Sequence, residues 1–473
     1  MNKRKIIIVG AGVAGVELYD ELKRRPSLGY EVVGFVDDDP KKQGKKIKGL
    51  PLLGNIRQLA SIVHQYKIEE VLIAIPSAQG SQIREIVTQC QNAQVIFRIV
   101  PRILEIIQGK VHIGQVRPVN VEDLLGRALR QHEQAQIAPL IRGKTVLVTG
   151  AAGSIGSELC RQILQFNPKK LIMVDWWENG LFELDREFSQ SASHISRESI
   201  IANIQDLPKV NWIFGKFRPQ IVFHAAAFKH VPLMELHPEE AVKNNIWGTQ
   251  VCARIAGEHK VDKFVFISTD KAVNPESVMG ASKLFAELIV RELGRKYSTK
   301  YITVRFGNVL GSYGSVVPIF TKQIARGGPV TVTNADMVRY FMTITEAAQL
   351  VLQSAQLGKG SEVFILDMGE PVRILELARL MIRLAGFQPD DEIPIKIIGR
   401  RPGEKLVEEL LTDQENAAKT TNDYIFISTN GINIDDGVLW HSFDRLKKLS
   451  DALNRPGILK ELGAILPVFK KKP

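Results

Sequence analysis

Cysteine is scarce in this sequence, with Cys90, Cys160 and Cys252 as the only three in 473 residues. They lie far apart and match neither the paired spacing of a zinc site nor a CxxC redox motif. The sequence therefore predicts no disulfide framework and no metal site, and isolated thiols of this kind suit a reducing compartment. A chain of this length can bury a core large enough to fold without such cross-links.

Long hydrophobic runs are also missing. No apolar stretch approaches the roughly 18 residues that a membrane-spanning helix needs. The opening residues MNKRKIIIVGAG lead directly into a strand pattern and not into a secretion signal. With 45% hydrophobic and 24% charged residues, the composition is that of a globular protein. We therefore expect a cytoplasmic protein, and the sequence as given excludes an integral membrane protein.

Acidic residues are outnumbered, because 62 Lys and Arg against 51 Asp and Glu give a net charge of +11. Such a charge is compatible with nucleic acid, with an anionic membrane surface or with anionic substrates. The basic residues are spread along the chain, and the small cluster at 41–48 has no interleaved aromatic residues. This distribution argues against a nucleic-acid partner.

Two segments of the sequence begin alike. KIIIVGAGVAGVEL (5–18) and KTVLVTGAAGSIGSEL (144–159) each combine a β-branched strand, a glycine-rich turn and an amphipathic helix. Each is followed by an apolar strand that ends in acidic residues, at 32–39 and 171–175. This is the pattern of a βαβ unit in a doubly wound sheet. We predict an α/β protein with two tandem Rossmann-like doubly wound parallel sheets, the second with a smaller C-terminal substrate-binding lobe.

The repeat also predicts the domain boundaries. The first Rossmann-like domain is expected at 1–135, a polar linker at 136–142 and one larger catalytic domain at 143–473. The expected parts of the larger domain are a dinucleotide-binding core at about 143–305, a substrate lobe mainly at about 306–412 and a helical segment at about 413–473.

The second glycine-rich turn has the features of a dinucleotide site. Gly150 suits the tight turn, Gly153 lets the backbone approach a pyrophosphate, and Gly156 lets the helix pack on the strand. The helix N-terminus offers free N–H groups to phosphates. Asp175, about twenty residues on, is placed to bind the adenosine ribose and to repel a 2′-phosphate, which favours NAD over NADP. The predicted cofactor contacts are Thr149, Gly150, Gly153, Ser154, Ile155, Gly156, Asp175, Asp206 near the adenine, Ala225, Ala226 and Lys283.

The first domain contains a similar set, Gly10, Gly12, Gly15 and Asp37. No catalytic residues follow it, and the same glycines can serve packing alone. The sequence leaves open whether this domain binds a ligand.

Five ordered motifs carry a resemblance to a known family: HAAAFKHVPLMELHPEEAVKNNIWGT (224–249), STDKAVNPESVMGASK (268–283), VRFGNVLGSYGSVVPIF (304–320), RYFMTITEA (339–347) and RPGEKLVEEL (401–410). The sequence resembles the extended short-chain dehydrogenase/reductases. Among them it is similar to the nucleotide-sugar 4,6-dehydratases of the polysaccharide-biosynthesis family, which act on UDP-N-acetylglucosamine. The resemblance covers essentially the whole chain. It implies NAD as cofactor and a UDP-4-keto-6-deoxy-N-acetylhexosamine as product, for surface polysaccharide or glycan synthesis.

The resemblance also implies properties beyond the reaction. Relatives usually carry transmembrane helices ahead of the first domain, so a location at the cytoplasmic face of the inner membrane is expected if such a region precedes this sequence. A homo-oligomer is expected, with the helices at 238–259 and 278–297 pairing across a two-fold axis.

Met279 stands where such enzymes have the Tyr of a Tyr-x-x-x-Lys motif, four residues before Lys283. Spacing of i, i+4 puts both side chains on one helix face. A thioether cannot exchange a proton, so another group must supply the acid–base chemistry. The resemblance implies that Lys283 holds the nicotinamide ribose and that Asn245 is the family's structural asparagine.

The replacement is expected at Thr269-Asp270-Lys271, at the end of a strand. By the resemblance, Thr269 bonds the C4 oxygen of the sugar, Asp270 is the acid at the C6 oxygen and Lys271 is the base at C5. A lysine base must be partly neutral, so burial or nearby cations such as Lys283 are expected to lower its pKa. Asp270, acting through Thr269, is the expected acceptor of the C4 hydroxyl proton.

The resemblance also predicts contacts with the UDP part of the substrate. Asn308, Arg339 and Arg401 fall where related enzymes contact the diphosphate, and Glu404 falls where the uridine ribose is bound. Planar guanidinium groups suit paired phosphate oxygens. Two other functions stay open, a UDP-sugar 4-epimerase and a non-catalytic protein that binds NAD or a nucleotide sugar.

Overall fold

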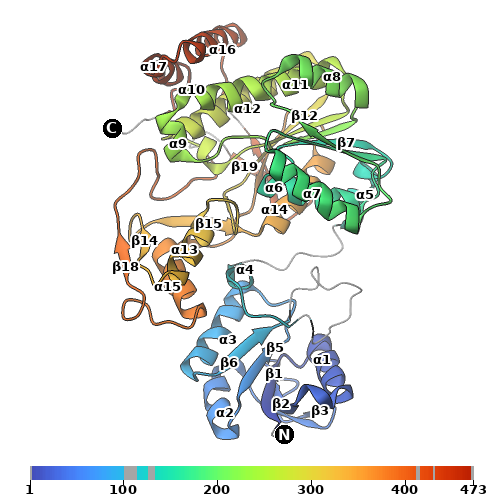
Figure 1. Ribbon diagram of the computed structural model, residues 1–473, viewed down its shortest axis with the longest axis vertical. Coiled ribbons are helices and arrows are strands. Elements are labelled where there is room, and N and C mark those ends of the chain that lie inside the picture. The colour runs from blue at the N-terminus through green and yellow to red at the C-terminus, as the bar shows by residue number, and fades with distance from the viewer. Residues whose placement is uncertain are drawn as a thin grey trace. The chain divides into compact units, whose positions relative to one another are not determined.

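The computed structural model describes residues 3–100, 114, 116–125, 134–411, 416–429 and 432–469. The chain forms two compact units, Met1–Gln131 and His132–Pro473 (Figure 1). The predicted boundary at 135 lies close to this division. Each unit has a sheet of its own, and the two are described separately.

The first unit is a mainly parallel sheet covered by helices. Its strands lie in the order β3-β4-β2-β1-β5-β6, and only β3 runs antiparallel to its neighbour. The strands are β1 (Arg4–Val9), β2 (Tyr30–Val36), β3 (Lys46–Ile47), β4 (Leu50–Gly54), β5 (Glu70–Ile73) and β6 (Ile96–Ile99). The helices are α1 (Val13–Arg24), α2 (Leu59–Tyr66), α3 (Gly80–Asn92) and α4 (Val121–Leu125).

The second unit is built on a nine-stranded sheet in the order β19-β20-β16-β12-β11-β10-β7-β8-β9. All neighbours from β16 to β9 run parallel, whereas β19 and β20 are antiparallel additions at one edge. The strands are β7 (Thr145–Thr149), β8 (Lys170–Asp175), β9 (Arg197–Ile201), β10 (Ile221–His224), β11 (Lys263–Ile267), β12 (Lys300–Arg305), β16 (Val363–Leu366), β19 (Asn416–Lys419) and β20 (Ile425–Thr429).

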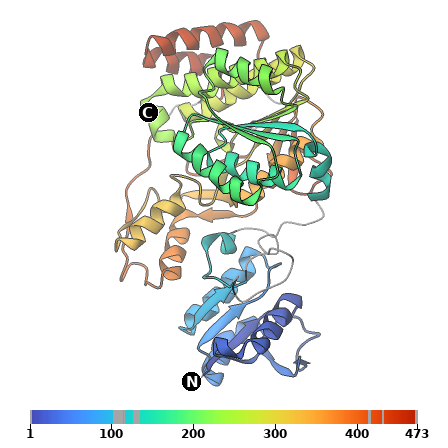
Figure 2. The same cartoon turned by 45° about the vertical axis from the view of Figure 1, so that its right-hand side comes forward.

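Helices cover both faces of this sheet (Figure 2). Successive side chains of a strand point to opposite faces, so Val146 and Val148 of β7 belong to one core and Leu147 to the other. The helices on the Val146 face are α5 (Gln134–Ile141), α6 (Ser154–Gln165), α7 (Glu178–Ser191) and α14 (Ile344–Leu357). Those on the Leu147 face include α8 (Leu207–Phe217), α11 (Thr249–Glu258) and α12 (Val278–Lys296). The predicted doubly wound parallel sheets are thereby confirmed.

The predicted polar linker at 136–142 is wrong. This segment lies in α5, and Ile137 and Ile141 are fully buried in the core beside α14. The apolar spacing of Ile137, Leu140 and Ile141 is that of a packed helix face, and the polar residues before it obscured this pattern.

The smaller lobe contains two short sheets and two helices. One sheet has the order β13-β15-β17 and the other pairs β14 with β18. These elements are β13 (Asn308–Val309), α13 (Val316–Ala325), β14 (Val330–Val332), β15 (Val338–Met342), β17 (Pro371–Arg373), α15 (Ile374–Leu384) and β18 (Ile395–Ile397). Two elements of the predicted lobe, α14 and β16, belong instead to the large sheet and its covering helices.

The expected C-terminal helical segment begins with two strands, β19 and β20, and only then becomes helical. Its helices, α16 (Asp436–Asp451) and α17 (Arg455–Ile465), pack on the Leu147-side core together with the π-helical segment η7 (Val242–Gly248). The rings of Trp247 and Phe443 stack there with centroids 5.7 Å apart. Figure 1 shows α16 and α17 beyond α10 (Pro238–Ala241) and α12. Helix α16 packs against α10, η7 and α12, and α17 packs against α10, within the segments that were expected to pair with a second copy.

Among the described residues, no helix combines the length and the apolar character required to cross a bilayer.

Candidate active site

The glycine-rich turn after β7 has the geometry of a phosphate cradle. Gly150 has a φ of 67°, and a Cβ there would lie 2.6 Å from the backbone nitrogen of Ala226. A Cβ at Gly156 would overlap the carbonyl oxygen of Gly150 where α6 packs on the turn. Gly153 is less constrained, with a φ of −71° and a nearest atom 3.2 Å from an added Cβ. Packing explains the first and third glycines, and the second leaves the turn open to a ligand.

A cavity of about 280 Å³ opens beside this turn. The predicted contacts that line it are Gly150, Gly153, Asp175, Ala225 and Ala226. The carboxylate of Asp175 accepts hydrogen bonds from the backbone N–H groups of Ala152 and Trp177, both at 2.9 Å. These bonds hold the Asp175 side chain at the cavity wall.

Other predicted cofactor contacts lie outside this lining. Ser154, Ile155 and Gly156 form the first turn of α6, and the Thr149 hydroxyl lies 2.7 Å from Nδ1 of the buried His224. Asp206 accepts the backbone N–H of Lys209 at 3.0 Å and thereby caps α8. Asn203, from the same loop as Asp206, lines the cavity, whereas Asp206 does not.

Two aromatic residues of the cavity were missed in the sequence. Trp176 and Trp177 follow Asp175 and line the cavity although their side chains are exposed. Trp177 meets Tyr313 edge to face, and the backbone N–H of Tyr313 donates to Ser154 Oγ at 3.2 Å. The only signal in the sequence is a pair of adjacent tryptophans directly after the strand-end acid.

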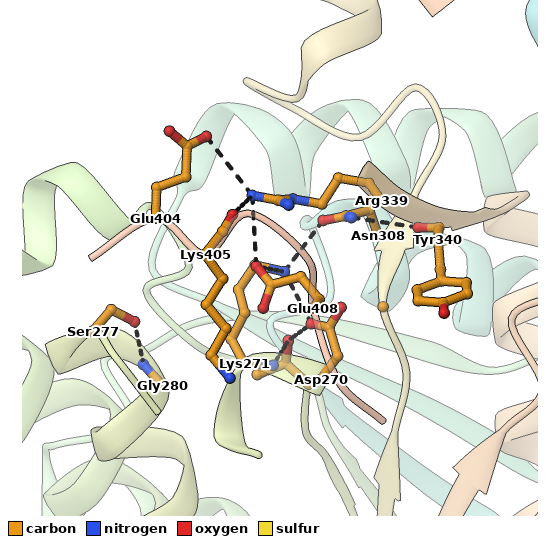
Figure 3. Close-up of polar contacts among 12 residues, drawn as sticks. Asp270, Lys271, Ser277, Gly280, Asn308, Arg339, Tyr340, Glu404, Lys405 and Glu408 are labelled. Atoms are coloured by element: carbon orange, nitrogen blue, oxygen red, sulfur yellow. Dashed lines mark hydrogen bonds and ion pairs between the residues drawn. The ribbon is translucent and has the colours of Figure 1, made fainter. Parts of the chain in front are cut away.

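Asp270 lies at the end of β11, two strands from the glycine-rich turn and at the same carboxyl edge of the sheet. Its side chain is fully buried. Oδ1 accepts hydrogen bonds from the Thr269 hydroxyl and from Lys271 Nζ, both at 2.9 Å (Figure 3). Oδ2 has no hydrogen-bond partner among the described residues, and a Cβ at Gly307 would lie 2.9 Å from it. One carboxylate oxygen therefore stays available for a ligand.

Lys271 joins three oxygen atoms from three different segments. Its Nζ lies 2.9 Å from Asp270 Oδ1, 3.3 Å from Asn308 Oδ1 and 3.6 Å from Glu408 Oε1 (Figure 3). Burial lowers the pKa of Lys271, but the two carboxylates raise it by more, so the net shift is upward. The expected lowering of this pKa is wrong for the protein without substrate, in which Lys271 is a protonated partner of Asp270.

Met279 and Lys283 lie on α12, which begins at the cap of Ser277 on the Gly280 N–H (Figure 3). Lys283 Nζ donates to the carbonyl oxygen of Ile267 at 2.7 Å and lies 3.9 Å from the centre of the Phe266 ring. Burial lowers the pKa of Lys283 to about 7. Of these two lysines, Lys283 is therefore the one whose pKa is lowered.

Asn245 connects the cavity to α12. It lies in the π-helical segment η7 and is fully buried. Its side chain accepts the backbone N–H of Phe228, which lines the cavity, and donates to the hydroxyl of Ser282. These contacts hold the segment after β10 against α12.

The predicted diphosphate contacts do not all converge. Asn308 lies beside Lys271, but Arg339 turns its guanidinium to the backbone, donating to the carbonyl oxygens of Val338 at 2.7 Å and Lys405 at 2.7 Å. Arg339 therefore holds the 401–410 segment on β15. Two further predicted contacts lie on that segment: Arg401 is exposed, and Glu404 accepts the Arg401 N–H at 3.1 Å.

Glu408 is a buried carboxylate that sequence reasoning missed. Its Oε1 lies 3.6 Å from Lys271 Nζ and 3.8 Å from Arg339 Nη2. Burial is the largest influence and raises the pKa of Glu408, although the charge of Lys271 opposes this. The sequence RPGEKLVEEL gave no sign that Glu408 is buried, because two other glutamates, Glu404 and Glu409, share the same motif.

The first unit has a comparable turn. Asp37 accepts the backbone N–H of Ala11 at 2.7 Å and pairs with Lys42 at 2.9 Å. A Cβ at Gly10 would lie 2.6 Å from the carbonyl oxygen of Ala74, whereas Gly12 has open space around it.

Two family descriptions match the chain. Residues 146–430 match a family described as polysaccharide biosynthesis protein, and residues 1–101 match a CoA-binding domain. The probable polysaccharide biosynthesis protein EpsC of Bacillus subtilis is 47% identical over 412 residues, which are 87% of this chain and 69% of that protein.

Relatives whose names state an activity are more distant. The inverting UDP-N-acetylglucosamine 4,6-dehydratase of Campylobacter jejuni is 31% identical over 282 residues, 59% of this chain and 80% of that protein. A UDP-glucose 4-epimerase of Rickettsia bellii is 33% identical over 298 residues, 62% of this chain and 85% of that protein.

Solved structures resemble the second unit. Pen from Bacillus thuringiensis has a TM-score of 0.56 and 34% identity, covering 62% of this chain and 89% of its own. The dTDP-glucose 4,6-dehydratase DesIV of Streptomyces venezuelae, solved with NAD bound, has a TM-score of 0.52 over 68% of this chain and 99% of its own. At 19% identity, DesIV shows a likeness of fold alone.

Proposed function

The chain belongs to the family of polysaccharide biosynthesis proteins, and on that premise we propose that it is an NAD-dependent UDP-N-acetylglucosamine 4,6-dehydratase. Its relatives are nucleotide-sugar dehydratases and epimerases, which supports an enzyme of this broad type. The product of the proposed reaction is a UDP-4-keto-6-deoxy-N-acetylhexosamine.

The observation that carries the proposal is the Asp270–Lys271 pair, 2.9 Å apart at the carboxyl edge of the sheet. Removal of water across C5 and C6 needs a base at one carbon and an acid at the oxygen of the next. Transfer of one proton from Lys271 Nζ to Asp270 Oδ1 creates both forms at once, a neutral amine and a carboxylic acid. After the elimination the amine holds the C5 proton and the acid has lost its own, so the ion pair is restored.

The cavity residues fit a dinucleotide whose adenosine ribose carries no 2′-phosphate, as in NAD. The Gly153 turn and the start of α6 would hold the pyrophosphate, and the Asp175 carboxylate would bind the ribose hydroxyl groups. Bound NAD supplies a hydride acceptor at C4 of the sugar and a hydride donor at C6. Lys283 would hold the nicotinamide ribose from α12, because its Nζ is already fixed at the end of β11 by the Ile267 carbonyl oxygen.

The C4 hydroxyl needs a proton acceptor, which Met279 cannot be. The Thr269 hydroxyl donates to Asp270 Oδ1 at 2.9 Å, so a proton leaving the C4 oxygen would pass through Thr269 and the Asp270–Lys271 pair to solvent, which leaves one proton on the pair for the elimination. In this assignment Thr269 orients the C4 oxygen and Asp270 serves two steps in turn.

The UDP part of the substrate would be held by the smaller lobe. Asn308 and the exposed Arg401 are proposed at the diphosphate, and Glu404 at the uridine ribose. Arg339 is left out of this set, because its guanidinium is bound to backbone carbonyl oxygens.

A UDP-sugar 4-epimerase is the second candidate, because the epimerase of Rickettsia bellii is 33% identical to this chain. Epimerisation at C4 needs no acid at the C6 oxygen. A buried acid–base pair beside Thr269 therefore favours the dehydratase.

The test is incubation of the protein and NAD with UDP-N-acetylglucosamine in D₂O, followed by proton NMR. A new C6 methyl signal together with deuterium at C5 is expected. A C4 epimer without that methyl group would support the epimerase. Unchanged substrate would support a non-catalytic binding protein.

A further inference from the structure

We propose that Glu408 is a positioning residue that keeps one shared proton on the Asp270–Lys271 pair, so that the pair stays competent as acid and base in mildly alkaline solution. The reading of that pair as catalytic rests on the proposed dehydratase function. The effect of Glu408 on the proton that the pair holds does not depend on that function.

Glu408 is held at this position by the 401–410 segment. Arg339 donates to the carbonyl oxygens of Lys405 at 2.7 Å and of Leu406 at 3.1 Å. Lys405 Nζ donates to the carbonyl oxygen of Val273, two residues beyond Lys271, at 2.9 Å. These backbone contacts fix the segment, and Glu408, which is 3% exposed, lies beside the Lys271 ammonium group (Figure 3).

The buried oxygens of Glu408 are only partly used. Oε1 approaches Lys271 Nζ at 3.6 Å and Arg339 Nη2 at 3.8 Å, whereas Oε2 is buried and has no hydrogen-bond partner among the described residues. A buried carboxylate without full hydrogen bonding is costly, so a charge partner must offset it. The Lys271 ammonium group is the nearest of the cations that the structure places beside it.

The charges around Lys271 come from several elements. The segment after β11 contributes Asp270, β15 contributes Arg339, and the loop after β10 contributes Lys229, whose pKa burial and then Lys271 lower. The 401–410 segment contributes Glu404, Glu408, Glu409 and Lys405. Of the acids, only Asp270 and Glu408 approach Lys271 Nζ within 4 Å among the described residues.

The elimination uses one proton of this pair. The C5–H bond breaks as neutral Lys271 Nζ forms a new N–H bond, and the electron pair becomes the C5–C6 double bond. The C6–O bond breaks, and its oxygen takes the proton of Asp270 and leaves as water. If the Asp270–Lys271 pair has lost its shared proton, Lys271 can still act as the base, but Asp270 has no proton to give to the C6 oxygen. The rate of the elimination must therefore fall above the pKa of that shared proton. An anion facing Lys271 moves this limit to higher pH.

Removal of the Glu408 charge therefore has a signed consequence. An opposite charge within about 4–6 Å typically shifts a pKa by 1–3 units. In Glu408→Gln we expect Lys271 to lose its proton about one to three pH units earlier than in the wild type, and the alkaline limb of the rate profile to move down with it. Glu409→Gln is the matched control, because Glu409 pairs with Lys405 on the same segment.

The first readout needs no turnover. The full-length protein is labelled with limiting acetic anhydride between pH 7 and 11, and acetylation of Lys271 is followed by mass spectrometry. The expected result is a lower titration midpoint for Glu408→Gln and an unshifted one for Glu409→Gln. Equal midpoints in the wild type and Glu408→Gln would overturn the inference.

The second readout is the pH dependence of C6 methyl formation. If the wild type forms no methyl product, the proposed function fails while the labelling still decides the role of Glu408. If the wild type turns over and the labelling midpoint does not move, the function stands and this inference fails. Should Glu408→Gln not fold, Glu408→Asp replaces it, and a midpoint at or above the wild-type value in that shorter variant would contradict the inference.

Discussion

The rings of Trp177 and Tyr313 meet edge to face, with centroids 5.6 Å apart and planes at 90°. Trp177 lines the cavity beside the glycine-rich turn, and Tyr313 comes from the smaller lobe, where its backbone N–H donates to Ser154 at the start of α6. The contact therefore joins the smaller lobe to the wall of the cavity that we propose for NAD. An enzyme that returns its hydride to the same substrate has no need to exchange its cofactor in each cycle.

Loss of this contact should speed cofactor release. We expect Tyr313→Ala to raise the dissociation rate of NAD by up to about tenfold, since an aromatic pair contributes about 0.5–1.5 kcal/mol. Stopped-flow tryptophan fluorescence during displacement by excess ADP-ribose measures that rate. Tyr313→Phe keeps the ring and should release NAD at the wild-type rate. Equal rates in all three proteins would show that the contact between Trp177 and Tyr313 does not slow NAD release.

A buried ion pair attaches α12 to the sheet. Glu287 accepts hydrogen bonds from Arg305 at 2.9 and 2.6 Å, and both side chains are 4% exposed. Breaking a buried pair leaves an uncompensated charge, so Glu287→Gln should lower the free energy of unfolding by about 3–5 kcal/mol. Urea denaturation measures the change. The exposed pair Glu183–Arg186 is the control, and Glu183→Gln should cost less than about 1 kcal/mol.

The acid and the base of the proposed reaction can be tested by substitution. Asp270→Asn and Lys271→Ala should each slow both C6 methyl formation and deuterium uptake at C5 by about 10²–10⁴ in rate, because Asp270 also serves the C4 oxidation that precedes them. Proton NMR in D₂O follows both signals. Lys448→Ala, at an exposed position of α16, should retain wild-type turnover. Near-full activity of Asp270→Asn would show that Asp270 is not the acid, and near-full activity of Lys271→Ala would show that Lys271 is not the base.

Local patterns in the sequence were enough to predict the two parallel sheets. Strand, glycine-rich turn and helix are adjacent in sequence, and Gly156 is required by a backbone contact within the same turn, with the carbonyl oxygen of Gly150. The strand-end position of Asp270 and the helical spacing of Met279 and Lys283 are local in the same sense. Such features can be predicted without knowledge of the rest of the fold.

Features that depend on distant segments were missed. The pKa of Lys271 is raised partly by Glu408, which lies far along the chain and is brought there by Arg339. Arg339 itself looked like a phosphate ligand because its backbone partners could not be read from the sequence. The packing of α16 on α12 is of the same kind, since an amphipathic C-terminal segment does not reveal which surface it packs against.

Lys283 makes the stability of the protein depend on pH in a predictable direction. Burial lowers its pKa from 10.5 to about 7, so between these values the folded form binds fewer protons at Lys283 than the unfolded chain does. The free energy of unfolding therefore rises with pH across this window, by at most about 1.4 kcal/mol per pH unit from this group. Below pH 7 both forms are protonated and the cost of burying the charge is fully present.

Replacement of Lys283 by methionine removes this contribution. The free energy of unfolding of the wild type, minus that of Lys283→Met, should increase by about 1–3 kcal/mol between pH 7.5 and 9.5. Urea denaturation at both pH values, without added cofactor, measures this double difference. Lys296→Met, at the exposed end of the same helix, should give no comparable increase. A difference that stays constant with pH would mean that Lys283 is charged in the folded protein, and its contact with Ile267 would then be that of an ammonium group.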